Sequence, residues 1–174
     1  IPTTHPTMTQ DEQQWLILLA RMTARCRAPV LRDTFSREVE QIPGAEAPTR
    51  LVLVFAKLLA GLRTIGLPNG EACRIILRLA KDSMPQMRRK ILDDLSTQNE
   101  GATTTDIATR LQTPTVTARR ALEDLHCYGM VDRDAGGEGK ADKWALSVLG
   151  AELYKGAQTF SEIRGDMYTE GESA

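Results

Sequence analysis

The sequence predicts a mainly α-helical protein in which a helical subdomain is followed by a winged helix-turn-helix with a small two-stranded β wing. Three observations predict this fold. Apolar residues recur at helical spacing through the first half of the chain, two short amphipathic segments follow each other closely after residue 103, and a glycine-rich hairpin pattern comes next. With 174 residues, the chain is long enough for one domain or two small ones.

The composition of the chain divides it into four expected segments. Residues 1–8 are rich in proline and threonine and are expected to form a disordered lead-in. The helical subdomain is expected over residues 9–83 and the winged helix-turn-helix over residues 84–155, followed by a flexible acidic tail over residues 156–174. No glycine- or serine-rich spacer separates the two halves, so we expect them to pack together.

The first helix is expected to begin at Thr9, which forms a capping-box pattern with Glu12, and to end before Pro29. Its apolar stripe consists of Trp15, Leu18, Leu19, Met22 and Cys26. Residues 30–42 mix β-forming residues with charges. That mixture fits either a short hairpin or an irregular crossover.

Two more helices are expected in this half, from Pro48 to about Ile65 and from Glu71 to Lys81, separated by the glycines and proline of residues 66–70. The residues expected to face inward are Leu51, Phe55, Leu58, Leu62 and Ile65 in the first of them and Ala72, Ile76, Leu79 and Ala80 in the second. Ser83 is expected to cap the next helix, which leads into the winged helix unit.

The helix-turn-helix is expected to begin at Thr103, which forms a short capping box with Asp106. Gln112 lies in the turn, where glycine is usual, so the turn must be made without easy access to a positive φ. Thr113 is expected to cap the second helix, and Pro114 suits the first helical position because its missing N–H costs nothing there.

The second helix of the pair has the pattern of a recognition helix. Its apolar stripe consists of Ala118, Ala121, Leu122, Leu125 and Tyr128, and Gly129 is expected to end it. The residues expected to point the other way are Val116, Arg119, Arg120 and Glu123. Threonines and arginines near the N-terminus of such a helix suit the reading of bases in the major groove of DNA.

The wing follows as two expected strands, residues 130–134 and 143–147, around a glycine-rich tip at residues 135–140. Trp144 and Leu146 share one face, and Ser147 is expected to begin a last helix through Tyr154. Two short amphipathic helices alone indicate a packed helix pair and a DNA-binding unit about equally. The glycine-rich hairpin that follows them favours DNA binding. The residues expected to contact duplex DNA are Thr115, Val116, Thr117, Arg119, Arg120, Arg133, Lys140 and Lys143.

The charge balance argues against strong DNA binding by the chain alone. The net charge is −1, and nine lysine and arginine residues lie between Met87 and Leu149 beside ten aspartate and glutamate residues. Non-specific affinity for DNA comes from excess positive charge, which this module lacks. We therefore expect weak binding by a monomer, strengthened by a homo-oligomer or a larger host protein.

Catalytic and metal-binding patterns are not found in the sequence. His126 and Cys127 are neighbours on a helix and therefore diverge, and the sequence contains no H-E-x-x-H, G-x-S-x-G or G-x-G-x-x-G motif. The three scattered cysteines form no C-x-x-C pair, which predicts reduced thiols in a cytoplasmic protein without disulfides or zinc. No apolar run is long enough for a membrane span, and no signal peptide is visible.

Two segments resemble the region that follows the ATPase core in a family of bacterial P-loop, AAA-like ATPases. The first is the run EAPTRL at residues 46–51 with LAGL at 59–62 and LAKDSMPQMRR at 79–89, and the second is TPTVTARRALEDL at residues 113–125, which resembles the recognition helix of the winged helix that ends those proteins. The resemblance covers residues 30–150. It implies a lid-like helical subdomain and an ATPase module upstream of Ile1.

The resemblance also implies a role for Arg50. In that family an arginine at the start of a lid helix often reaches the γ-phosphate of a neighbouring nucleotide, and Arg50 has a matching place beside Pro48. A solvated arginine near a helix start is the alternative. This chain has no G-x-x-x-x-G-K-[ST] loop, so we expect no cofactor bound by the chain itself. ATP and Mg²⁺ would bind to the parent protein.

Three functions follow as hypotheses. The first is a non-catalytic winged-helix module that binds double-stranded DNA as the C-terminal part of a larger AAA-like ATPase or replication-type protein. The second is a protein-interaction winged helix that packs on the ATPase core or on a partner without touching DNA. The third is a stand-alone transcriptional regulator that dimerises through its N-terminal helices.

Overall fold

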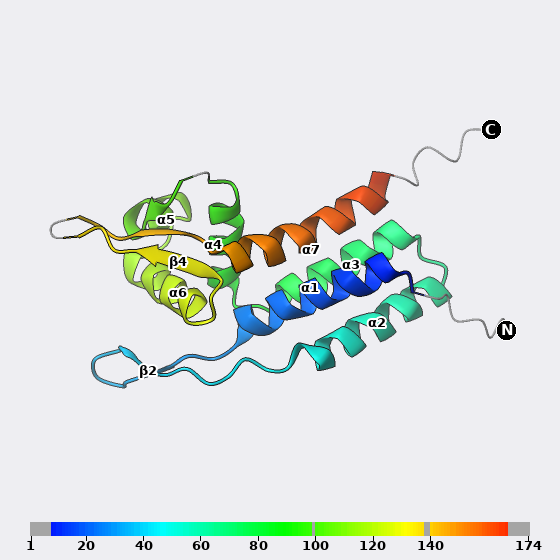
Figure 1. The fold of residues 1–174 in the computed structure, drawn as a ribbon, viewed down its shortest axis with the longest axis horizontal. Coiled ribbons are helices and arrows are strands. Elements are labelled where there is room, and N and C mark those ends of the chain that lie inside the picture. The colour runs from blue at the N-terminus through cyan, green and yellow to red at the C-terminus, as the bar shows by residue number, and fades with distance from the viewer. Residues whose placement is uncertain (1–7, 99, 138–139, 167–174) are drawn as a thin grey trace.

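The computed structural model describes residues 8–98, 100–137 and 140–166 (Figure 1). Its helical half contains α1 (Gln10–Arg27), α2 (Pro48–Thr64), α3 (Asn69–Asp82) and α7 (Val148–Asp166). Its other half contains α4 (Gln86–Ser96), α5 (Thr104–Arg110) and α6 (Thr115–Cys127) with strands β3 (Ala102–Thr103), β4 (Val131–Asp134) and β5 (Lys143–Leu146). The predicted fold class, mainly α with a winged helix, is confirmed.

The core of the helical half forms where α1 packs between α2, α3 and α7. Trp15, Leu16 and Leu19 of α1 are buried there, together with Leu59 of α2 and Ile76 of α3. The indole Nε1 of Trp15 donates a hydrogen bond of 3.0 Å to the carbonyl of Ala157 in α7. α7, the last helix of the described residues, therefore lies against the first, whereas the sequence pattern predicts it as part of the winged helix.

Three expectations about helix ends and faces are wrong. α7 continues to Asp166, ten residues beyond the predicted start of the flexible tail. Ile65 and Leu79, expected to face inward, are 73% and 43% exposed, because Leu59 in α2 and Cys73 and Leu77 in α3 occupy the buried positions instead. Residues 1–7 and 167–174, for which disorder is expected, lie outside the described residues.

The predicted capping box of α1 is confirmed, and its glutamate has a second role. Glu12 is buried and accepts bonds from the Thr9 N–H at 3.0 Å and from Arg63 of α2 at 2.5 Å. Burial by itself raises the pKa of Glu12, but these bonds outweigh it and hold the pKa below its ordinary value. One residue thus caps α1 and ties it to α2.

Two predicted caps are wrong for a common reason. Ser83 ends α3, and its hydroxyl donates to the carbonyl of Ala80, while Pro85 precedes α4. Thr113 makes no capping bond, and Pro114 lies one position before α6 begins. In both places a proline in extended conformation sets the start of the helix without a side-chain hydrogen bond.

The winged helix half contains one strand more than predicted. β3, β5 and β4 form an antiparallel sheet in that order, with Ala102 opposite Trp144 and Val131 opposite Leu146. β3 has two residues, too few to produce an alternating pattern in the sequence. The extra strand joins the start of α5 to the wing.

The turn between α5 and α6 departs from expectation at Gln112. This residue has a φ of +50°, so the turn does use the left-handed region without a glycine. A side chain in that region costs roughly 1–2 kcal/mol. The predicted capping box of Thr103 and Asp106 at the start of α5 is confirmed.

Candidate nucleic-acid interface

α6 has one buried and one exposed face, as its sequence predicts. Ala118, Ala121, Leu122, Leu125 and Tyr128 are all buried, and Gly129 follows the helix with a φ of +68°. The exposed face of its first two turns carries Thr115, Val116, Thr117, Arg119 and Arg120. Val116 is an apolar member of this face and is 60% exposed.

The wing consists of β4, β5 and the loop between them, and a buried tryptophan fixes it. Trp144 donates from Nε1 to the hydroxyl of Thr104 at 2.9 Å, and its ring meets the edge of His126. Arg133 lies over the Trp144 ring and forms an ion pair of 2.5 Å with Asp142. The hydrogen bond from Arg133 lowers the pKa of Asp142. Arg133 is therefore held by a carboxylate, whereas Lys140 and Lys143 are exposed.

A second hairpin, which we call the arm, comprises residues 31–41. Its strands are β1 (Leu31–Arg32) and β2 (Val39–Gln41), so the hairpin alternative for residues 30–42 is the correct one. The carboxylate of Asp33 accepts the N–H groups of Phe35 and Ser36 at the tip, and Arg37 has a φ of +62°. None of residues 31–41 is buried, and Phe35 is 94% exposed.

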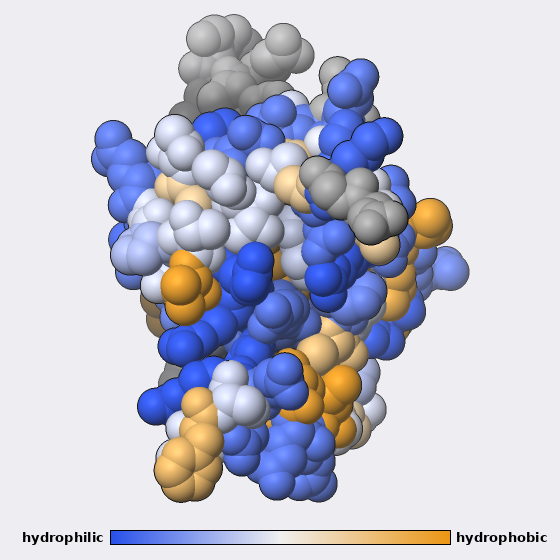
Figure 2. Space-filling model, turned by 90° about the vertical axis from the view of Figure 1, so that its left-hand side faces the viewer, coloured by the Kyte–Doolittle hydropathy of each residue, from blue (hydrophilic) through white to orange (hydrophobic). Residues whose placement is uncertain are grey.

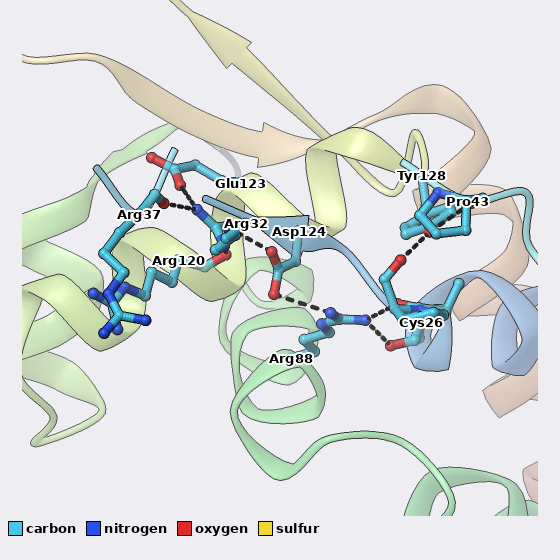
Figure 3. A network of polar contacts seen from close by, with 11 residues as sticks. Cys26, Arg32, Arg37, Pro43, Arg88, Arg120, Glu123, Asp124 and Tyr128 are labelled. Carbon is cyan, nitrogen blue, oxygen red and sulfur yellow. Dashed lines mark hydrogen bonds and ion pairs between the residues drawn. The ribbon is translucent and has the colours of Figure 1, made fainter. Parts of the chain in front are cut away.

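Ion pairs join the arm to α6 (Figure 3). Arg32 donates to Glu123 at 2.8 Å, to Asp124 at 2.6 Å and to the carbonyl of Arg120 at 3.2 Å. Partial burial lowers the pKa of Arg32, but the bonds to these two carboxylates outweigh that effect and raise it overall. The other oxygen of Asp124 accepts from Arg88 of α4 at 2.9 Å.

Arg88 connects this network to the helical half. Its side chain is buried and donates to the carbonyl groups of Cys26 and Ala28, at the end of α1, at 2.9 and 2.7 Å. The hydroxyl of Tyr128, just after α6, donates to the carbonyl groups of Pro29 and Pro43 on either side of the arm. The direction of the arm is therefore set jointly by α1, α4 and α6.

α6, the arm and the wing together enclose a groove of about 780 Å³. Its charged lining residues are Arg32, Arg37, Arg119, Arg120, Arg133, Glu38 and Glu123. Five arginines beside two glutamates make the groove positive in a chain whose net charge is −1. Figure 2 shows this end of the molecule, where hydrophilic residues cover the middle of the surface.

The structure brings together some of the predicted contact residues and leaves others apart. Thr115, Val116, Arg119, Arg120 and Arg133 line the groove. The remaining predicted contacts, Thr117, Lys140 and Lys143, are exposed outside its lining. Arg50, the residue expected to sense nucleotide, is exposed in the first turn of α2 and does not line the groove.

Sequence reasoning missed Arg32, Arg37 and Arg88. The ambiguity of residues 30–42 was the only available signal, because Arg32 and Asp124 are separated by 92 positions. Contacts at that separation leave no periodic trace in a single sequence.

No cluster of histidine, cysteine, aspartate or glutamate suited to a metal ion occurs among the described residues. The three cysteines are free thiols, and burial raises the pKa of Cys26 to about 12. Within the described ranges, no helix has the length and apolar character needed to cross a membrane.

Comparisons with known proteins identify only distant structural similarity. No family model and no curated protein sequence matches the chain. The chain is similar to the crystal structure of the transcriptional regulator SlyA, with a TM-score of 0.40 and 19% sequence identity over 64% of this chain and 80% of that chain. A similarity this distant does not define a family for the chain.

Proposed function

We propose that the chain binds duplex DNA through α6 and the wing. One observation carries the proposal: the first two turns of α6 expose Thr115, Val116, Arg119 and Arg120 along a positively charged groove. Arginine and threonine side chains donate hydrogen bonds to base edges, and exposed apolar groups contact the thymine methyl. Val116 is the exposed apolar side chain that could make this contact.

The affinity of an isolated chain should be low and strongly dependent on salt. The free basic residues at this end are few, and Arg133 must leave or share Asp142 before it can bind a phosphate. Each phosphate contact adds about 0.9 to the slope of log K against log salt. Two copies of the chain on one duplex, or a host protein that holds the chain near DNA, would raise the effective affinity.

The parent of this module, in our proposal, is an AAA-like ATPase, and the chain itself is not an enzyme. This part of the proposal rests on the sequence resemblance over residues 30–150 and on the exposed position of Arg50 in the first turn of α2. ATP and Mg²⁺ would bind to the parent and not to this chain. The stand-alone cytoplasmic regulator is the alternative that the same winged helix allows.

Fluorescence anisotropy with a labelled duplex tests DNA binding directly. We expect binding at low salt that weakens steeply at moderate salt. Arg119→Ala should weaken it by about 1–3 kcal/mol if Arg119 makes a bidentate base contact. Arg110→Ala is the matched control, because Arg110 is already paired with Asp94 at 2.6 Å. No binding at high-micromolar protein and low salt would exclude DNA as the partner.

A specific observation favours protein interaction as the second candidate. Leu31, Phe35 and Val39 of the arm are all exposed and lie on the same hairpin. Exposed apolar residues that gather in one place are typical of protein-binding surfaces. If duplex DNA does not bind, this hairpin is the first surface to test against an ATPase core.

A further inference from the structure

The arm and α6 bring two arginine side chains to the same part of the groove. Arg32 donates to the carbonyl of Arg37 in the arm and to the carbonyl of Arg120 in α6, both at 3.2 Å. One guanidinium thus fixes the backbone of both residues. In Figure 3 the side chains of Arg37 and Arg120 run toward the same place, and both line the groove.

Two carboxylates near these arginines are already occupied. Glu123 is paired with Arg32, and the two oxygens of Asp124 accept from Arg32 and Arg88. Glu38, the other carboxylate of the groove, makes no ion pair with either arginine in the described part of the chain. The backbones of Arg37 and Arg120 therefore lie beside the same guanidinium, both side chains line the groove, and neither forms an ion pair within the described residues.

The backbone of the arm supports the same interpretation. Arg37 is held at a φ of +62°, although a glycine there would avoid the strain, and the bonds of Asp33 fix the turn before it. Ser36 also lines the groove. A hydrogen-bonded turn that holds an arginine in a strained conformation is a feature found more often at binding sites than in plain connections.

We infer that Arg37 and Arg120 together bind one backbone phosphate of the duplex that lies on α6. This inference rests on the proposed DNA binding and adds the arm to it as a second clamp, opposite the wing. Arginine binds phosphate oxygens through paired N–H donors, so two guanidiniums can surround one phosphate. The phosphate would supply the negative charge that the groove lacks.

The salt dependence of binding separates one shared phosphate from two independent ones. We expect Arg37→Ala and Arg120→Ala each to reduce the slope of log K against log salt by about one, and the double variant also to reduce it by about one. Arg74→Ala is the matched control, since Arg74 is an exposed arginine of α3 outside the groove. It should leave the slope unchanged.

Arg37→Gly tests whether a loss of DNA binding comes from the missing guanidinium or from unfolding of the arm. It removes the guanidinium and also relieves the left-handed conformation, so it should weaken DNA binding as much as Arg37→Ala while the arm stays folded. Arg37→Lys should retain most of the slope because the charge is kept.

The outcomes distinguish the inference from the function on which it rests. If the unmodified chain binds duplex and Arg119→Ala weakens it, while Arg37→Ala behaves like Arg74→Ala, the phosphate clamp is wrong and DNA binding stands. A double variant that lowers the slope by about two would show separate phosphates and overturn the shared site. If the unmodified chain does not bind duplex at all, both proposals fail.

Discussion

The wing and the arm are two hairpins beside the same helix, and different forces hold them in place. The wing buries Val131 and Trp144, pairs with a third strand and is joined to Thr104 by a hydrogen bond. The arm buries no residue between 31 and 41. Beyond the Tyr128 hydroxyl at its base, ion pairs and hydrogen bonds hold it against α6.

This difference has a physical consequence. Apolar burial responds little to salt, whereas exposed or half-exposed ion pairs are screened by it. The wing should therefore stay in place under conditions that loosen the arm. Low local stability is common in segments that bind ligands, and the arm has the properties of such a segment.

The largest expected effect is that of Trp144→Ala. The substitution removes the aromatic anchor of the wing and leaves a cavity, at a cost of about 3–5 kcal/mol in the free energy of unfolding. Phe35→Ala in the arm is the matched control, because its ring is 94% exposed, and it should change stability by less than about 0.5 kcal/mol. Chemical denaturation measures both. Similar losses in the free energy of unfolding for the two variants would show that the wing is not held by burial more than the arm is.

Asp124→Asn should have the next largest effect. It removes the carboxylate shared by Arg32 and Arg88, and Arg88 is buried. Breaking a buried pair costs 3–5 kcal/mol, but Arg88 keeps its two carbonyl partners, so we expect about 2 kcal/mol. Glu123→Gln removes only a contact of the arm and should cost less than about 1 kcal/mol. Equal losses in the free energy of unfolding for the two variants would mean that the ion pair between Arg88 and Asp124 does not stabilise the fold.

Two glycine substitutions compare the hairpin with the turn before α6. Gln112→Gly relieves a left-handed conformation worth roughly 1–2 kcal/mol and loses roughly 0.5–1 kcal/mol in entropy, so a gain of about 0.5–1 kcal/mol is expected. That gain should appear in global unfolding. Arg37→Gly should instead slow only the local opening of the arm, measured by amide hydrogen exchange. A rise in global stability from Arg37→Gly would show that the arm unfolds with the core.

The smallest expected effect is the response of the arm to acid. Hydrogen bonds from the N–H groups of Ser36 and Phe35 lower the pKa of Asp33 below its ordinary 3.8. Because the folded pKa is the lower one, the ionised carboxylate supports the turn above about 3.8, and this support is lost as the pH falls through the folded value. NMR titration of the Phe35 and Ser36 amides should give a midpoint below 3.8. A midpoint at or above it would contradict the bonded turn.

Features set by neighbouring residues could be predicted from the sequence. The capping boxes of Thr9 with Glu12 and of Thr103 with Asp106 span three positions each, and both are present. The buried face of α6 follows from helical spacing within one segment. These patterns depend on local geometry, which a single sequence records directly.

Features set by distant residues could not be predicted. The place of the arm depends on Arg32 reaching Asp124, 92 positions away, and the place of α7 beside α1 depends on Trp15 reaching Ala157, 142 positions away. At Gln112 the tertiary structure overrides a local preference, because the packing of α5 and α6 requires the turn whether or not a glycine is present. Ser83 and Thr113 fail as caps because an adjacent proline already fixes the helix start.

The position of Asp124 also has a consequence for how sequences of this kind can diverge. One carboxylate receives an arginine from the arm through one oxygen and an arginine from α4 through the other. A change at position 124 alone leaves Arg88 without a carboxylate partner and leaves Arg32 with Glu123 only. In homologous chains we therefore expect positions 32, 88 and 124 to vary together, and an alignment in which they vary independently would show that the arm adopts other orientations there.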